Sequence, residues 1–129
     1  DGCAYFAPFA ARRVLRVDPV RQRVERIGPL LSPLRKYDAD GVLGPDGCLY
    51  FAPLGRGKVL RIDPREPGGP EARLMDSGTP IMGYYGRGAV ALDGCIYFAP
   101  GSSLDQVLRV DPEGQAVELF GRHLGSALE

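Results

Sequence analysis

The side chains of this 129-residue chain that could act as nucleophiles, proton carriers or metal ligands are few. His123 is its single histidine, so neither a two-histidine metal site nor a Ser-His-Asp relay is expected. His123 follows Arg122, and we expect it to be a solvent-exposed surface residue. Ser102 and Ser103 follow Gly101, a composition that is typical of a turn. The sequence therefore predicts no catalytic residue, no metal site and no cofactor site.

The three cysteines occupy equivalent positions of a repeated sequence. Cys3, Cys48 and Cys95 stand 45 and 47 residues apart. Equivalent positions in neighbouring repeats should be separated by more than the roughly 7 Å between Cα atoms that a disulfide tolerates, and a tetrahedral zinc ion would need a fourth ligand. We expect three reduced thiols that behave as small buried hydrophobic side chains.

An arginine and an aspartate, separated by one residue, recur together with each cysteine. The pairs are Arg16/Asp18, Arg61/Asp63 and Arg109/Asp111. One interpretation is a ring of receptors for phosphate or carboxylate groups. The other is that each arginine pairs with an aspartate of its own or the adjacent repeat and fixes one repeat against the next. We favour the second, because a feature present in every repeat usually serves the repeat itself.

The cysteines and the arginine–aspartate pairs are positioned by a repeat of two short motifs. In the third copy the first motif is Asp93-Gly94-Cys95-Ile96-Tyr97-Phe98-Ala99-Pro100, and the second runs from Val107 to Pro112. The other copies are Asp1 to Pro8 with Val14 to Pro19, and Asp46 to Pro53 with Val59 to Pro64. A period of this length predicts one four-stranded unit per repeat.

Each repeat reads as a meander of four short antiparallel strands. In the third copy these are residues 88–92, 95–99, 107–111 and 116–120, and Asp93-Gly94 is a two-residue hairpin signal. In the second copy they are 42–43, 48–52, 59–63 and 72–75; in the first they are 3–7, 14–18 and 24–27, with nothing before Asp1 to supply the first strand. The second strand of each repeat is apolar on both faces, which predicts burial between two neighbouring sheets. Phe51 and Phe98 should be almost fully buried there.

This pattern resembles the blades of β-propellers of the NHL and SMP-30-like group. It is also similar to tandem repeats of the D-G-x-I-Y-x-x-P…V-L-x-I-D-P kind in dinoflagellate and other microalgal proteins. The resemblance implies an all-β fold, a β-propeller-type array of about three four-stranded antiparallel blades in a single domain of residues 1–129, with the first blade lacking its inner strand. The blades would be about 1–29, 41–76 and 88–121.

SMP-30-like propellers are metal-dependent lactonases that hold a divalent ion with acidic and amide side chains in a central channel. Here the inner strands contain residues such as Val42, Leu43, Ala89 and Val90, and the chain has no asparagine. Because such residues cannot ligate a hard cation, lactonase chemistry is not expected.

Charge is distributed unevenly along a chain whose formal net charge is zero. Residues 1–65 hold 12 Lys or Arg against 7 Asp or Glu, whereas residues 66–129 hold 4 against 9. Head-to-tail association would exploit this asymmetry, and a dispersed solvated surface is the alternative. A neutral chain without a basic aromatic face is not expected to bind nucleic acid. No apolar run approaches the roughly 20 residues that span a bilayer, so we expect a soluble protein.

Binding residues are expected in the loops between repeats and along the bare edge of the first strand present. The loop candidates for protein binding are Leu30, Leu31, Tyr37, Ile81, Met82, Tyr84 and Tyr85. The candidates for edge pairing are Cys3, Ala4, Tyr5, Phe6 and Ala7. Residues 125–129 align with 88–92, so that two chains would close a six-bladed ring; residues 124–129 also align with 30–35, which would make them a loop of a longer array. We favour the second alignment, because it has more identities.

These features predict a non-enzymatic protein–protein interaction or scaffold module, self-assembling or an accessory subunit of a larger complex. The algal resemblance suggests a plastid complex. The alternative is a small-molecule or sugar-binding propeller, or a divergent SMP-30-like hydrolase. The predicted partner is protein, either a second copy or subunits of a complex, and no cofactor is predicted.

Overall fold

The structure is a computed structural model of the whole chain. It describes residues 1–9, 11–31, 37, 40–55, 57–65, 69–78, 81, 83–84, 88–101 and 106–121. These residues form eleven β-strands in three antiparallel sheets. No helix that could cross a membrane is found among them.

Each sheet is a meander in which consecutive strands are neighbours. The first, blade 1, contains β1 (Ala4–Phe6), β2 (Val14–Asp18) and β3 (Arg23–Ile27). Blade 2 contains β4 (Val42–Leu43), β5 (Leu49–Phe51), β6 (Val59–Asp63) and β7 (Glu71–Met75). Blade 3 contains β8 (Ala89–Val90), β9 (Ile96–Phe98), β10 (Val107–Asp111) and β11 (Ala116–Phe120).

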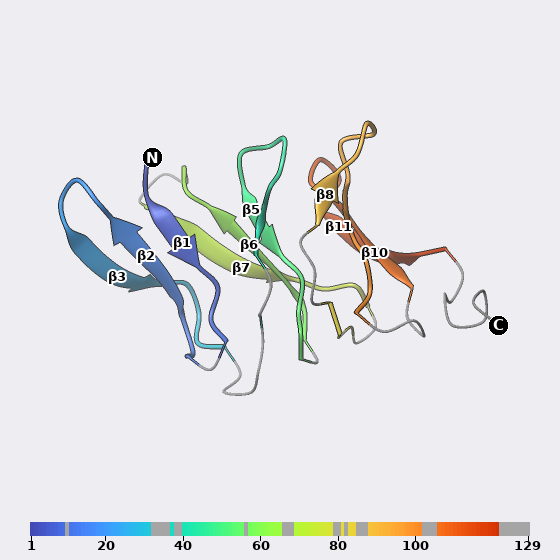
Figure 1. Cartoon of the computed structure of the whole chain (residues 1–129), viewed down its shortest axis with the longest axis horizontal. Helices are drawn as coiled ribbons and strands as arrows, with labels where there is room; N and C mark the ends of the chain where they lie inside the picture. The colour runs from blue at the N-terminus through green and yellow to red at the C-terminus, as the bar shows by residue number, and fades with distance from the viewer. Residues whose placement is uncertain are drawn as a thin grey trace.

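The three sheets stand side by side in chain order (Figure 1). This arrangement confirms the predicted all-β, propeller-type array of blades, with the inner strand missing from blade 1. The long strands β2, β6, β10 and β11 have the bounds expected from the sequence, whereas β1, β5 and β9 are one residue shorter at each end.

The turn between the first two strands of a blade differs from the two-residue hairpin predicted for Asp93-Gly94. Gly94 donates its N–H to the carbonyl of Ala91 at 3.0 Å, so the turn spans four residues with Leu92 and Asp93 at its centre. Only Gly94 has a positive φ, at 81°, and Asp93 does not. A two-residue type I′ turn needs positive φ at both central residues, which explains why the longer turn followed by a left-handed glycine forms.

The turn between the last two strands is closed as expected by the aspartate of the Asp-Pro motif. Asp18 Oδ1 accepts from Val20 N at 3.0 Å, Asp63 Oδ1 from Arg65 N at 2.9 Å and Asp111 Oδ1 from Glu113 N at 3.1 Å. A carboxylate in this position replaces a backbone acceptor and holds the turn.

The core lies between the blades, and blade 2 contributes a different face to each neighbour. We name these faces after their aromatic residue. The tyrosine face of blade 2 packs on blade 3 and holds Val42, Cys48, Tyr50, Val59 and Met75. The phenylalanine face of blade 2 packs on blade 1 and holds Leu49, Phe51, Leu60, Ile62 and Ala72.

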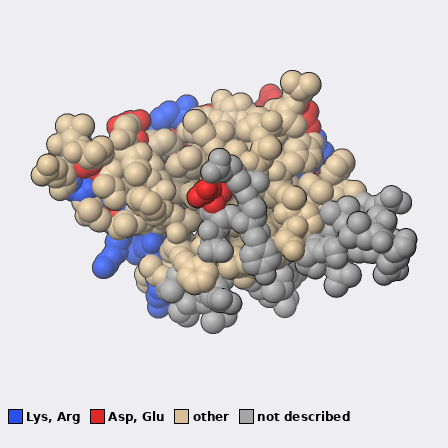
Figure 2. All heavy atoms as spheres, in the orientation of Figure 1, with Lys and Arg blue, Asp and Glu red and all other residues tan. Residues whose placement is uncertain are grey.

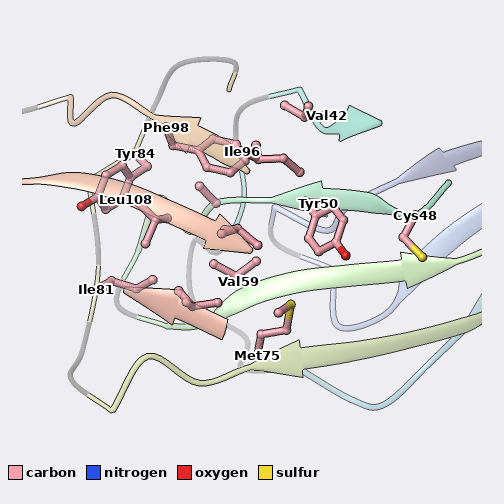
Figure 3. Packing of buried hydrophobic residues seen from close by; sticks show 13 residues of the cluster. Val42, Cys48, Tyr50, Val59, Met75, Ile81, Tyr84, Ile96, Phe98 and Leu108 are labelled. Carbon is pink, nitrogen blue, oxygen red and sulfur yellow. The ribbon is translucent and has the colours of Figure 1, made fainter. Parts of the chain in front are cut away.

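Each neighbouring blade packs its opposite face against blade 2. Blade 3 presents its phenylalanine face to blade 2, with Ile96, Phe98, Leu108, Val110 and Val117. Figure 3 shows side chains of both blades gathered between their strands. Blade 1 presents its tyrosine face, with Tyr5, Val14 and Ile27. The tyrosine face of one blade therefore packs on the phenylalanine face of the next at both interfaces.

Phe51 and Phe98 are buried, as predicted from the strand register. Phe6, at the equivalent position of blade 1, is 55% exposed. Among the described residues blade 1 has no neighbour on its phenylalanine face and blade 3 has none on its tyrosine face, so the expectation that this strand is buried on both sides holds for β5 and is wrong for β1 and for the tyrosine side of β9.

Candidate functional site: a groove beside an unpaired strand edge

Strand β1 is hydrogen-bonded on one side only. Its neighbour is β2, and no described strand pairs with its other edge. In blade 2, Gly44 N donates to the carbonyl of Cys48 at 2.8 Å, and Val42 is the partner of Tyr50. In this antiparallel register the carbonyl of Cys48 and both backbone groups of Tyr50 point toward the inner strand, whereas the Cys48 N–H donates to Asp46. The equivalent groups of blade 1 belong to Cys3 and Tyr5, and they point to the open edge.

A groove of about 630 Å³ runs along this edge. One wall is β1, with Tyr5, Phe6 and Ala7, and the other is the edge of blade 2 around β4. The remaining lining residues are Tyr37, Asp40, Gly41, Val42, Leu43, Leu49, Phe51 and Gly88. The groove therefore lies where blade 1 lacks the strand that β4 and β8 provide in the other blades.

The other two blades show what the missing strand must look like. A glycine precedes the inner strand and lies under the phenylalanine ring of the neighbouring strand. A Cβ added to Gly41 would be 2.5 Å from Phe51 Cζ, and one added to Gly88 would be 2.6 Å from Phe98 Cε1. Since real Cβ atoms do not approach so closely, a strand that fills the groove needs glycine opposite Phe6.

The tyrosine of β1 is held in place by a local network. Tyr5 donates its hydroxyl proton to Asp1 Oδ2 at 2.6 Å, and Cys3 N donates to Asp1 Oδ1 at 3.2 Å. Arg16 reaches Asp1 Oδ2 at 3.1 Å and Glu25 Oε1 at 2.7 Å, and its Nε donates to the Tyr5 hydroxyl at 3.1 Å. This wall of the groove is therefore ordered before any strand is added.

The same tyrosine–aspartate bond occurs in every blade. Tyr50 donates to Asp46 Oδ2 and Tyr97 to Asp93 Oδ2, each at 2.6 Å. The hydrogen bonds from the Tyr97 hydroxyl and the Cys95 N–H lower the pKa of Asp93 below its ordinary value. Asp93 is consequently ionised at neutral pH and holds the turn before β9.

The repeated arginines pair within their own blades. Arg109 contacts Asp93 at 3.8 Å and Glu118 at 2.7 Å, in the pattern of Arg16 with Asp1 and Glu25. In blade 2, Arg61 pairs with Asp63 at 3.5 Å. None of the ion pairs found between described residues joins these arginines to another blade, so their expected role in fixing blade against blade is replaced by a role inside each sheet.

Four of the predicted loop residues are buried in the core. Tyr37 donates to the carbonyl of Lys58 at 2.6 Å, and Tyr84 donates to the carbonyl of Gln106 at 2.7 Å. Lys58 and Gln106 each precede the third strand of a blade, so the two tyrosines are equivalent although the sequence analysis took them to lie outside the repeat. Their role is packing between blades in place of the expected surface role.

Leu31 and Ile81 form a second equivalent pair. Leu31 N donates to the carbonyl of Arg12 at 2.7 Å, and the carbonyl of Ile81 accepts from Gly57 N at 3.0 Å. Both side chains are buried. Leu30 is exposed, and Met82 and Tyr85 lie outside the described residues. Among the loop candidates that the structure describes, Tyr37 alone also lines the groove.

The described residues contain no group of three His, Cys, Asp or Glu side chains that could hold a metal ion. His123, Ser102 and Ser103 lie outside the described part of the chain, as do residues 122–129 with both alignments proposed for them. The groove offers aromatic rings, one carboxylate from Asp40 and backbone groups of β1. This combination is suited to binding an extended peptide.

The residues of the groove on β1 were predicted from the sequence, and those of its second wall were not. That wall depends on the way β4 and Gly88 approach β1, which is a long-range contact with no local signal. The glycine before each inner strand was the available signal, because Gly41 and Gly88 occupy the same place in the repeat.

No family of known proteins matches this chain, and no curated protein matches it either.

Proposed function

We propose that this chain is a non-enzymatic protein-interaction module that binds an extended strand of a partner protein in the groove beside β1. The observation that carries the proposal is the coincidence of an unpaired strand edge with a groove of about 630 Å³. Addition of a strand to an exposed sheet edge is a recurring mode of protein recognition, in which backbone hydrogen bonds supply affinity and pockets for side chains supply specificity.

The other blades define the chemistry of the bound strand. It runs antiparallel to β1 and pairs with the backbone of Cys3 and Tyr5, as Gly44 and Val42 pair with Cys48 and Tyr50. Its residue opposite Phe6 is glycine. The next residues are small and apolar, as in 41–43 and 88–90. Such a segment, Gly followed by two or three small apolar residues, is the partner sequence we expect.

A peptide with the sequence of residues 88–92, Gly-Ala-Val-Ala-Leu, tests this directly. We expect the fluorescently labelled peptide to bind the chain in an anisotropy titration. The matched peptide Val-Ala-Val-Ala-Leu places a side chain against the Phe6 ring and should bind at least about tenfold more weakly, a difference of about 1.4 kcal/mol. Equal binding of the two peptides would contradict the proposed register.

A variant with its groove already filled provides the second arm. Adding Gly-Ala-Val-Ala-Leu directly before Asp1 reproduces the order in which residues 88–92 precede Asp93. This variant should fold its extension onto β1, unfold at higher urea concentration and lose peptide binding. The same extension with valine in place of glycine is the control and should retain binding. Full peptide binding by the glycine variant would show that the groove is not the binding site.

A small apolar or sugar ligand is the second candidate for the same groove. Its volume lies in the range of small-molecule pockets, and the rings of Tyr5, Phe6 and Phe51 line it together with Asp40. A panel of monosaccharides and disaccharides separates the two functions, because a sugar that binds the wild type and competes with the peptide would favour this alternative. The similarity of the repeats to microalgal proteins is the support for a plastid complex as the setting.

A further inference from the structure

The two ends of the blade array present faces that match each other. Inside the chain, a tyrosine face packs on a phenylalanine face twice. At one end the phenylalanine face of blade 1 has no neighbour among the described residues. It carries Phe6, Leu15, Val17 and Val24. At the other end no described residue covers the tyrosine face of blade 3, which holds Tyr97, Val107 and Phe120.

The exposures of these side chains differ from those of their interior equivalents. Val24 is 65% exposed, whereas Ala72 and Val117 at the same register position are buried. Phe120 is 49% exposed, whereas Met75 is buried. Tyr97 and Phe120 form an edge-to-face ring pair with centroids 5.8 Å apart. The chain therefore has apolar residues on two end faces that no described residue covers.

A close contact between the first two blades has an open counterpart at the far end. Gly28 follows β3, and a Cβ added to it would be 2.6 Å from Ala72 Cβ in blade 2. Gly121 follows β11 at the equivalent position and has a similar φ, 82° against 77°. No described atom lies within 4 Å of an added Cβ at Gly121. If the packing is repeated, Gly121 lies against Val24 of a following blade 1.

A glutamine with an uncommon backbone conformation occurs in equivalent turns of blades 1 and 3 and indicates the same packing between them. Gln22 and Gln115 are the two described residues other than glycine with positive φ, both at 52°. Gln115 of blade 3 bonds to Arg73 of blade 2 and lies 3.5 Å from the Tyr50 hydroxyl. Gln22 occupies the equivalent turn of blade 1, where no preceding blade is described. Repetition of the packing places Gln22 against Tyr97 of a preceding blade 3.

The distribution of charge along the chain also favours contact between the blade 3 end of one copy and the blade 1 end of another. The half of the chain that contains blade 1 has five more basic than acidic residues, and the half that contains blade 3 has five more acidic than basic residues. Figure 2 shows Lys and Arg atoms gathered below the blade 1 end of the visible face. Opposite potentials steer such ends together and disfavour contact between like ends.

We propose that two copies of this chain associate head to tail, with the tyrosine face of blade 3 of each copy packed on the phenylalanine face of blade 1 of the other. Two such contacts bury both end faces of both copies. Six blades lie within the range of four to eight that closes a propeller, so the association ends at a dimer. The inference rests on the interaction function proposed above and names a second copy as one partner.

Light scattering on a size-exclusion column measures the mass of the chain in solution, and we expect twice 13.9 kDa. Gly121→Ala should shift the mass to the monomer, because its methyl group meets Val24 of the other copy. Gly94→Ala is the matched control, since Gly94 has φ 81° and no described atom within 4 Å of an added Cβ, but lies in a turn off both faces. It should remain a dimer.

Val24→Asp gives an independent test on the opposite face, with Val20→Asp, 90% exposed in the adjacent turn, as its control. We expect the Val24→Asp variant to be a monomer and the Val20→Asp variant to remain a dimer. Wild-type monomer at every concentration, open-ended growth, or equal behaviour of each variant and its control would overturn the proposal. Measuring peptide binding with both the wild type and the Gly121→Ala variant keeps the two proposals separate. A monomer that binds the peptide leaves the groove function intact. A wild-type dimer that binds no peptide leaves the contact between end faces intact.

Discussion

Asp93 illustrates how one carboxylate supports the blade at the scale of a residue. Its lowered pKa means that ionised Asp93 stabilises the fold above the unfolded-state pKa of about 3.9 and that this stabilisation is lost as the pH falls through the folded-state value. Tyr97→Phe removes the hydrogen bond that contributes most to the shift. We expect a carboxyl NMR titration to give a higher pKa for Asp93 in this variant. Tyr84→Phe, which loses a bond to a carbonyl elsewhere, should leave the titration of Asp93 unchanged.

The same phenylalanine position has two environments, which gives a matched pair of stability tests. Phe98 is completely buried, and Phe98→Ala should reduce the free energy of unfolding by about 3 to 5 kcal/mol, the usual loss for a core aromatic residue. Phe6→Ala, made in the Gly121→Ala monomer so that no second copy covers the ring, removes a side chain that is 55% exposed and should reduce this free energy much less. Urea unfolding measures both changes. Similar losses in the two variants would show that the assignment of the blade faces is wrong.

The thiols give a prediction for the second strand of each blade. Cys3 is half-buried, whereas Cys48 and Cys95 are buried, and burial raises the pKa of the Cys48 thiol to about 11. In the native protein Cys3 should react first with an alkylating reagent. After denaturation without reductant, three modified cysteines are expected in the mass spectrum. A mass about 2 Da lower, with one modified site, would instead reveal a disulfide.

At the scale of the strands, the sequence predicted the bounds of a strand correctly where the residue types and their period determine them. The alternation of Val107 to Asp111 predicts β10 to the residue, because one face of that strand is apolar and the other polar. The turn predicted at Asp93-Gly94 was displaced by one residue, since the pair of residue types alone does not reveal which of them takes a positive φ. Tyr37 and Tyr84 were expected to bind a partner from the loops, but each stands 11 residues before the cysteine of the following repeat, so this spacing was an available signal of their equivalent contacts.

At the scale of the whole molecule, the repeat count predicted an open edge, and the structure adds the groove and the two end faces. Neither follows from one repeat by itself. The groove needs β1 next to the inner edge of blade 2, and the end faces are recognised only after the two interior interfaces have shown which face meets which.

Amide hydrogen exchange at two adjacent residues tests the central claim that the edge of β1 binds a strand. The Tyr5 N–H points to the open edge, whereas the Phe6 N–H points to β2. We expect the Tyr5 amide to exchange rapidly in the free protein and at least about tenfold more slowly with the Gly-Ala-Val-Ala-Leu peptide bound, while the Phe6 amide is protected in both states. Bound peptide with an unchanged exchange rate at Tyr5 would contradict the account.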